Sequence, residues 1–312
     1  MQNEKTKAMT QGAAMLALFT IFFVIAMYVP LIGLIAFLIA PIPIAWYAAK
    51  YTRSQAILLG VIALILSFLF GGFVGPGLAS ISILTGIMLG DGIRQKKSKI
   101  YLFMSTGVSI LLTFAILFVV TSKFMGINFI TEGMELSKTT YKESLEYASQ
   151  QSGKALPVEQ MNQMFEYIEM TVPATITLGV FMLSFVLMTV TLATFKRLKV
   201  DVPKFPPFKD MRLPKAVLWY YLIVLSINLF VNPEVGSTLY IITVNFSVVL
   251  WVLLTIQGVS LFFYIIHAFK YPTFLKVLAV MMSLPLYSYV ILVGIVDLGF
   301  NVRQFIDEKS QK

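Results

Sequence analysis

The sequence predicts an all-α protein, a polytopic transmembrane helical bundle of about eight or nine spans. Its 312 residues are 58% hydrophobic and only 12% charged, whereas soluble domains carry about 25% charged residues. Apolar runs of roughly 20 residues, the length that crosses the hydrocarbon core of a bilayer, recur along the chain. Cysteine is absent and His267 is the single histidine, so we expect no disulfide, no metal site and no cofactor.

Nine apolar segments are expected to form the spans. Prolines should kink or shorten the second, and a glycine-rich turn over 71–77 precedes the fourth. The first six segments are Gln11–Val29, Leu31–Ala49, Gln55–Phe70, Leu78–Leu89, Ile100–Thr121 and Pro173–Phe195. The last three are Ala216–Val231, Thr238–Ile266 and Phe274–Phe300, which Pro285 interrupts.

Charge and proline divide the chain into modules. We expect a six-span module over residues 1–195 with an extracytoplasmic helical insert over 123–170. A basic, proline-rich cytoplasmic linker over 196–215 leads to a C-terminal module of two or three spans over 216–312. Within the insert, apolar residues at helical spacing predict an amphipathic helix over Pro157–Met170, which either lies on the membrane surface, caps the bundle or covers a ligand.

The distribution of Lys and Arg predicts the orientation. Basic residues gather at the N-terminus and after the second, fourth and sixth spans, whereas the opposite loops hold few. Positive loops stay on the cytoplasmic side, so we expect a cytoplasmic N-terminus and a first span that is kept as an anchor. The net charge of +9 then reflects loops facing anionic lipid, not nucleic acid. Nine spans would put the C-terminus outside, whereas a re-entrant break at Pro285 would return it to the inside.

Small residues recur at four-residue spacing, which places two of them on one helix face. Such faces allow two membrane helices to approach closely. Gly86 and Gly90 are expected to serve helix packing within the bundle. Ala13 and Ala17 form a similar face on the first helix, which packing inside the bundle or docking of a partner would explain.

Charged and polar residues inside the spans are few. Asp91 and Asp297 lie near span ends, and Asp297 precedes Arg303 closely enough to form an interfacial ion pair. The alternative for either carboxylate is a proton or cation relay. Uncharged polar residues in the later spans would either line a cavity or join helices by hydrogen bonds. These are Asn228, Asn245 and Gln257.

No motif indicates catalysis. A phosphate-binding glycine loop followed by lysine is absent, and one histidine at a helix end cannot support a Ser-His-Asp arrangement. We therefore expect no enzyme and no catalytic residue.

Residues 8–197 resemble the substrate-binding membrane subunit of energy-coupling-factor transporters. The resemblance lies in Gly12–Leu18, the proline-containing second span ending in Ala48–Lys50, Gly60, and the glycine turn before the span that ends in Gly86–Gly90. It implies six spans with both ends cytoplasmic, and Ala13 and Ala17 docking on a coupling subunit. Two departures are the very short connection at Pro30 and the additional C-terminal spans.

The whole chain, including the ending Gly294–Phe300, more closely resembles the uncharacterised YybS-like family of bacterial membrane proteins. That resemblance implies a place in the bacterial cytoplasmic membrane and no agreed activity.

Three functional hypotheses follow. The first is a substrate-binding or transport-type subunit for an unknown small-molecule ligand, embedded in the lipid bilayer and working with protein partners such as a coupling subunit. The second is a membrane scaffold or cell-envelope morphogenesis component without solute transport. The third is a proton-coupled carrier that uses Asp297.

Overall fold

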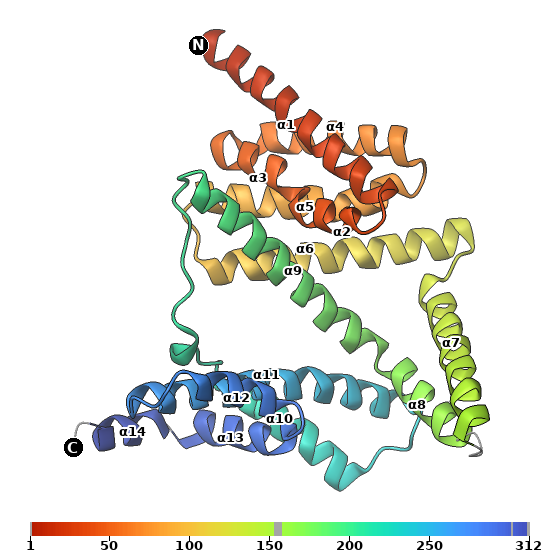
Figure 1. The fold of residues 1–312 in the computed structure, drawn as a ribbon, viewed down its shortest axis with the longest axis vertical. Coiled ribbons are helices and arrows are strands. Elements are labelled where there is room, and N and C mark those ends of the chain that lie inside the picture. Colours follow the sequence, from red (N-terminus) through yellow and green to blue (C-terminus); the bar gives the residue numbers. More distant parts are fainter. Residues whose placement is uncertain (1, 153–157, 301, 311–312) are drawn as a thin grey trace. The chain divides into compact units, whose positions relative to one another are not determined.

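The computed structural model describes all residues except 1, 153–157, 301 and 311–312, and every element in the described part is helical (Figure 1). In that part, seven helices are long and apolar enough to span a membrane. They are Glu4–Tyr28, Ile32–Lys50, Arg53–Gly71, Gly75–Arg94, Lys99–Met125, Val172–Arg197 and Thr238–Ala268. The all-helical, multi-span prediction is confirmed.

Two of the three predicted C-terminal spans explain why the structure holds fewer candidate spans than the sequence predicted. Phe274–Ser283 and Tyr287–Phe300 are bent by 111° at the expected break, and counting this pair as one span gives up to eight. The predicted seventh span, Ala216–Val231, is apolar but shorter than the others. The structure thus holds seven or eight candidate spans where the sequence predicted eight or nine.

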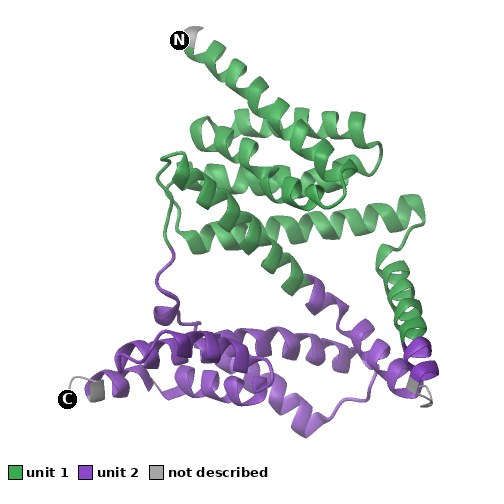
Figure 2. Cartoon of the chain, viewed as in Figure 1, with its two compact units in different colours: residues 1–144, 177–204 green, residues 145–176, 205–312 purple. Residues whose placement is uncertain are grey.

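The described chain divides into two compact units (Figure 2). Unit 1 comprises residues 1–144 and 177–204, and unit 2 comprises residues 145–176 and 205–312. The division at residue 204 falls inside the predicted 196–215 linker. Residues 145–176, which the sequence analysis places in the first module, belong to unit 2.

Unit 1 is built around α5 (Gly75–Arg94), which contacts α3, α4 and α6. Its other elements are α1 (Gln2–Tyr28), α2 (Ile32–Ile39), α3 (Pro41–Lys50), α4 (Arg53–Gly71), α6 (Lys99–Val120), the π-helical turn η1 (Thr121–Met125), most of α7 (Phe129–Ser152) and most of α9 (Val172–Arg197).

Two backbone features shape the predicted second span, which the structure holds as one candidate span, Ile32–Lys50, made of α2 and α3. Before α2, Leu31 has φ 64° and ψ −56°, and the N–H of Ile32 donates to the carbonyl of Pro30 over 2.7 Å. These values describe a classic γ-turn, which is rare and strained for a residue other than glycine. After α2, Pro41 begins a new helix at its first position, where the missing N–H costs no helical hydrogen bond.

Glycines bring α5 unusually close to α3. A Cβ atom at Gly86 would lie 2.7 Å from the Cβ of Ile44, and one at Gly90 would lie 2.6 Å from the Cβ of Ala48. Because neither glycine has a side chain, the two backbones can approach to a distance that any larger residue would prevent. Both glycines are buried, so the structure places them in packing within unit 1.

Unit 2 is built around α11 (Thr238–Ala268), which contacts α8, α10, α12, α13 and α14. The bounds of its remaining elements are α8 (Val158–Met170), the 3₁₀ turn η2 (Phe208–Asp210), α10 (Ala216–Ser226) with the π-helical turn η3 (Ile227–Val231), α12 (Phe274–Ser283), α13 (Tyr287–Phe300) and α14 (Val302–Ser310). Gly258 and Gly294 permit close approach of α11 and α13, since a Cβ at Gly258 would lie 2.8 Å from Cγ1 of Val290.

The insert contains two helices where the sequence predicted one. Asn128 accepts a hydrogen bond from the N–H of Thr131 and so caps the unpredicted helix α7. The sequence did not predict α7, because this polar segment lacks the apolar stripe that identifies an amphipathic helix. The predicted helix over Pro157–Met170 corresponds to α8, with Pro157 outside the described residues. Met161 and Phe165 are buried, and α8 contacts α11.

The glycine packing leads to a stability prediction. Gly90→Ala should lower the free energy of unfolding by about 1–3 kcal/mol, because the added methyl group overlaps α3. Gly179→Ala in α9 is the matched control, since a Cβ there has nothing within 4 Å; helix propensity should leave it unchanged or up to about 1 kcal/mol more stable. Unfolding in detergent, followed by circular dichroism, measures both. Equal stability of the two variants would contradict the close approach of α3 and α5.

Candidate functional site

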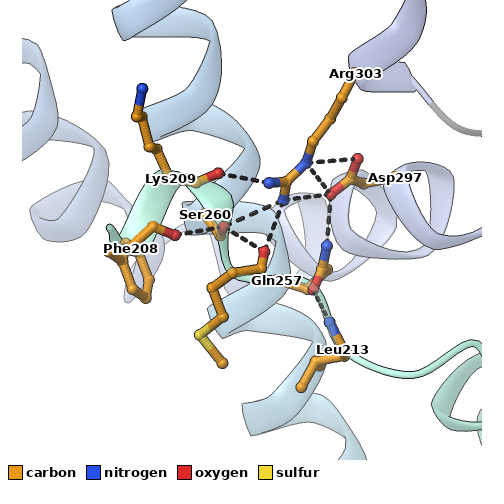
Figure 3. Close-up of polar contacts among 8 residues, drawn as sticks. Phe208, Lys209, Leu213, Gln257, Ser260, Asp297 and Arg303 are labelled. Carbon is orange, nitrogen blue, oxygen red and sulfur yellow. Dashed lines mark hydrogen bonds and ion pairs between the residues drawn. The ribbon is translucent and has the colours of Figure 1, made fainter. Parts of the chain in front are cut away.

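A buried polar cluster lies in unit 2 (Figure 3). We call it the Arg303 cluster: the side chains of Gln257 and Ser260 on α11, Asp297 on α13 and Arg303 on α14, with the backbone of residues 208–213. These four side chains come from three helices, and each is at least 94% buried, with Arg303 only 1% exposed. Arginine is almost never enclosed to this extent unless its charge is paired.

The ion pair forms the centre of the cluster. Nη2 of Arg303 lies 2.8 Å from Oδ2 of Asp297, and Nε of Arg303 donates to the same oxygen over 3.1 Å. Both side chains are 1% exposed. The structure therefore brings Asp297 and Arg303 together as predicted. The ion pair is buried inside unit 2, whereas the sequence predicted an interfacial pair.

The backbone that follows residue 204 supplies the remaining acceptors for Arg303. Nη1 donates to the carbonyl oxygen of Lys209, and Nη2 donates to that of Met211 over 3.0 Å. Lys209 lies within the 3₁₀ turn η2, and Met211 directly follows this turn. One guanidinium therefore satisfies a carboxylate and two backbone carbonyls, which its five N–H donors allow.

Gln257 and Ser260 complete the attachment of this segment to α11. The side-chain oxygen of Gln257 accepts from the N–H of Leu213 over 2.8 Å, and its nitrogen donates to Asp297 over 2.5 Å. The hydroxyl of Ser260 lies 2.8 Å from the carbonyl oxygen of Phe208. Hence α11 forms hydrogen bonds with both ends of residues 208–213, and Arg303 on α14 forms hydrogen bonds with the middle of this segment.

The geometry favours a structural role for these charges. A buried charge is tolerated where an opposite charge and hydrogen bonds replace its hydration. Asp297 has both, from Arg303 and Gln257. Proton exchange at this carboxylate would require opening of the cluster, because in this conformation the carboxylate is enclosed by protein. The relay alternative for Asp297 stays a prediction.

Two other predicted polar residues have identified partners. Asp91 accepts from Arg94, with which it forms an ion pair one helical turn apart, and from Gln95 over 2.6 Å. Asn245 on α11 donates to the carbonyl of Met170 over 2.7 Å and accepts from the N–H of Ala174 over 2.8 Å. Asn245 therefore joins α11 to the end of α8 and the start of α9. Asn228 is exposed.

The small residues of α1 differ from those of α5. Ala13 and Ala17 are both exposed in the structure, as is Ala14 between them, whereas Gly86 and Gly90 are buried against α3. The predicted docking face on α1 is therefore exposed at these three alanines.

A half-open apolar cavity of about 320 Å³ lies in unit 1 between α1, α2 and α5. It is close to the turns that join α1 to α2 and α4 to α5. Its lining residues are Phe23, Ala26, Met27, Gly33, Leu34, Phe37, Ala40, Leu78 and Ser82. Its volume is near the lower end of the range for small-molecule sites, about 300–1,000 Å³.

Comparison with known proteins identifies the family. Residues 17–298 match the model of a family described as predicted membrane protein (DUF2232). The chain belongs to this family. It is also 30% identical over 310 residues to a Bacillus subtilis (strain 168) protein named Uncharacterized protein YybS, covering 96% of this chain and 98% of the relative. The predicted resemblance to YybS-like proteins is confirmed. No solved structure matches the chain, and the resemblance of residues 8–197 to an energy-coupling-factor subunit stays a prediction.

Sequence reasoning found the charged members of the Arg303 cluster but not its extent. Asp297 and Arg303 were paired from their proximity, and Gln257 was noted as a polar residue in a span. Ser260 carries no signal, since serine is common in membrane helices. The carbonyls of Lys209 and Met211 could not be found, because every residue has a carbonyl.

The Arg303 cluster leads to a second stability prediction. Arg303→Met should lower the free energy of unfolding by about 3–5 kcal/mol, because it leaves the buried carboxylate of Asp297 without its opposite charge and removes the donor to the carbonyl of Lys209. Arg94→Met removes the same charge from a pair in which Arg94 is 35% exposed, and should cost at most about 1 kcal/mol. Urea unfolding monitored by tryptophan fluorescence compares them. Similar losses for both variants would show that the cluster does not stabilise unit 2.

Proposed function

We propose that this protein is a non-enzymatic, substrate-binding or transport-type subunit of the bacterial cytoplasmic membrane. Unit 1 captures a small molecule, and a separate membrane protein docks on α1 and supplies the energy. The N-terminus is cytoplasmic in this proposal, as the distribution of Lys and Arg indicates.

The cavity between α1, α2 and α5 is the observation that carries the proposal. Ligand sites in helical bundles lie between helices and are lined mostly by apolar side chains, which describes this cavity. Its nearest turns, at Pro30 and at Gly72, are on the side opposite the basic loops. Under the proposed orientation the cavity lies in the outer half of the membrane, where a molecule arriving from outside would be captured.

The exposed face of α1 supports the docking part of the proposal. Ala13, Ala14 and Ala17 leave a shallow strip on a helix that is otherwise covered by larger side chains, among them Leu18 and Ile21. A second helix can approach such a strip more closely than lipid chains can fill it, and van der Waals packing then drives association.

A scaffold or envelope-morphogenesis component is the second candidate, and the same exposed face favours it. Docking of partners on α1 requires no ligand in the cavity. The two candidates therefore differ in whether a small molecule is bound in unit 1.

Native mass spectrometry of the purified full-length protein tests the capture of a ligand. We expect a small molecule that is retained by the wild type and lost in Ala26→Phe, whose ring fills the cavity. Ile21→Phe is the control, because Ile21 is on the same helix, is 53% exposed and does not line the cavity. An identical spectrum for all three proteins, with no bound molecule, would reject the substrate-binding function and leave the scaffold.

Copurification from bacterial membranes tests the docking face. Ala13→Leu combined with Ala17→Leu should abolish copurification of a defined membrane partner, because the larger side chains prevent close approach. Ala115→Leu on α6 is the control: Ala115 is also exposed, but the residues four positions away, Leu111 and Val119, are large. Unchanged partner recovery with the double variant would exclude this face.

A further inference from the structure

We infer that the cavity of unit 1 binds the hydrocarbon chain of a membrane lipid or a lipid-like molecule. The inference rests on the proposed function and names the class of its ligand. It assigns the site to α1, α2 and α5, with Ala26, Leu34 and Leu78 on three of its walls.

The chemistry of the lining selects for a hydrocarbon. Eight of the nine lining residues are apolar or glycine, and Ser82 supplies the one side-chain hydroxyl among them. A polar molecule would lose its hydrogen bonds to water and find almost no replacement, which costs several kcal/mol for each unsatisfied group. A hydrocarbon chain has no such groups and gains contacts with Phe23, Met27 and Phe37.

The residues around the cavity face the bilayer, from which a hydrocarbon chain of a lipid can enter. Around it, Leu34 is 69% exposed, Ile35 is 61% exposed and Leu78 is 43% exposed. These residues belong to helices long and apolar enough to span the membrane, so their exposed sides face lipid. A chain can therefore pass from the bilayer into the cavity without crossing water or a polar barrier.

The backbone of α2 positions one wall of the cavity. The γ-turn at Leu31 folds α2 back against α1, where a Cβ at Gly33 would lie 2.8 Å from the carbonyl oxygen of Ala26. Beyond Ala40 the chain continues as α3, which packs on α5. The cavity lies between α1, α2 and the first part of α5.

Photolabelling tests the assignment. The full-length protein is reconstituted in vesicles of phosphatidylethanolamine and phosphatidylglycerol that contain a phosphatidylglycerol with a diazirine at the end of one acyl chain. Illumination followed by peptide mass spectrometry locates the adducts. We expect saturable labelling of lining residues on α1, α2 and α5, and labelling in proportion to probe concentration at lipid-facing residues such as Leu58 and Ile65, which are 61% and 64% exposed.

The variants used for native mass spectrometry sharpen this test. Ala26→Phe should reduce the saturable adducts to the level of the lipid-facing surface, and Ile21→Phe should retain them. Circular dichroism shows whether both variants keep the helical content of the wild type. If Ala26→Phe is unfolded, unlabelled phosphatidylglycerol added in excess to the wild type serves instead and should displace the saturable adducts.

The outcomes separate this inference from the proposed function. Adducts that never saturate, with a retained polar molecule that Ala26→Phe removes, would overturn the lipid assignment and leave substrate capture standing. Adducts that never saturate, with no retained molecule, would overturn both. Saturable adducts at the lining residues that only Ala26→Phe removes would establish the site.

Discussion

Close approach of helix backbones is the constraint on which both units depend. In hydrocarbon, burial of an apolar side chain gains little, because lipid chains are as apolar as the protein, so helices associate through packing and hydrogen bonds. In unit 1, Gly86 and Gly90 let α5 contact α3 directly. In unit 2, Gly258 and Gly294 do the same for α11 and α13. The central helix of each unit therefore carries a glycine contact to a neighbour, and the other helices are arranged around that pair.

Non-helical backbone needs hydrogen-bond donors for its carbonyls, and in unit 2 the buried side chain of Arg303 supplies them. Backbone that leaves a helix inside a membrane protein must be enclosed by protein and must have its carbonyls satisfied. Arg303 donates to the carbonyl of Lys209 within η2 and to that of Met211 directly after it, and Ser260 also donates to the Met211 carbonyl. The guanidinium needs an anion in return, which Asp297 supplies. Support of this backbone is therefore a sufficient structural reason for the ion pair.

The sequence predicts what depends on composition and local spacing, and less of what depends on long-range partners. The spans follow from hydropathy, and the break near Pro285 follows from the missing N–H of proline. Gly86 and Gly90 were found because they are spaced as a small-residue pair. Gly258 and Gly294 were not, because each is alone on its helix face and meets its partner only after folding.

The division of the insert between the units has the same origin. The sequence shows a polar segment between two spans and gives no sign that its second part belongs with the C-terminal unit. That attachment depends on Asn245, which bonds to Met170 and Ala174 across more than 70 residues of chain. An asparagine in an apolar helix indicates a hydrogen bond. It does not indicate the partner, so the boundary at residues 144 and 145 could not be predicted.

Small residues with four-residue spacing occur on two helices of unit 1, and burial distinguishes the two cases. Gly86 and Gly90 have four-residue spacing and are buried against α3, so their packing is complete. Ala13 and Ala17 have the same spacing and are exposed, so they are not buried in a helix contact within unit 1. The cavity lies further along the same helix, at Phe23, Ala26 and Met27. A partner docked on α1, as proposed, would therefore contact the helix that forms one wall of the cavity.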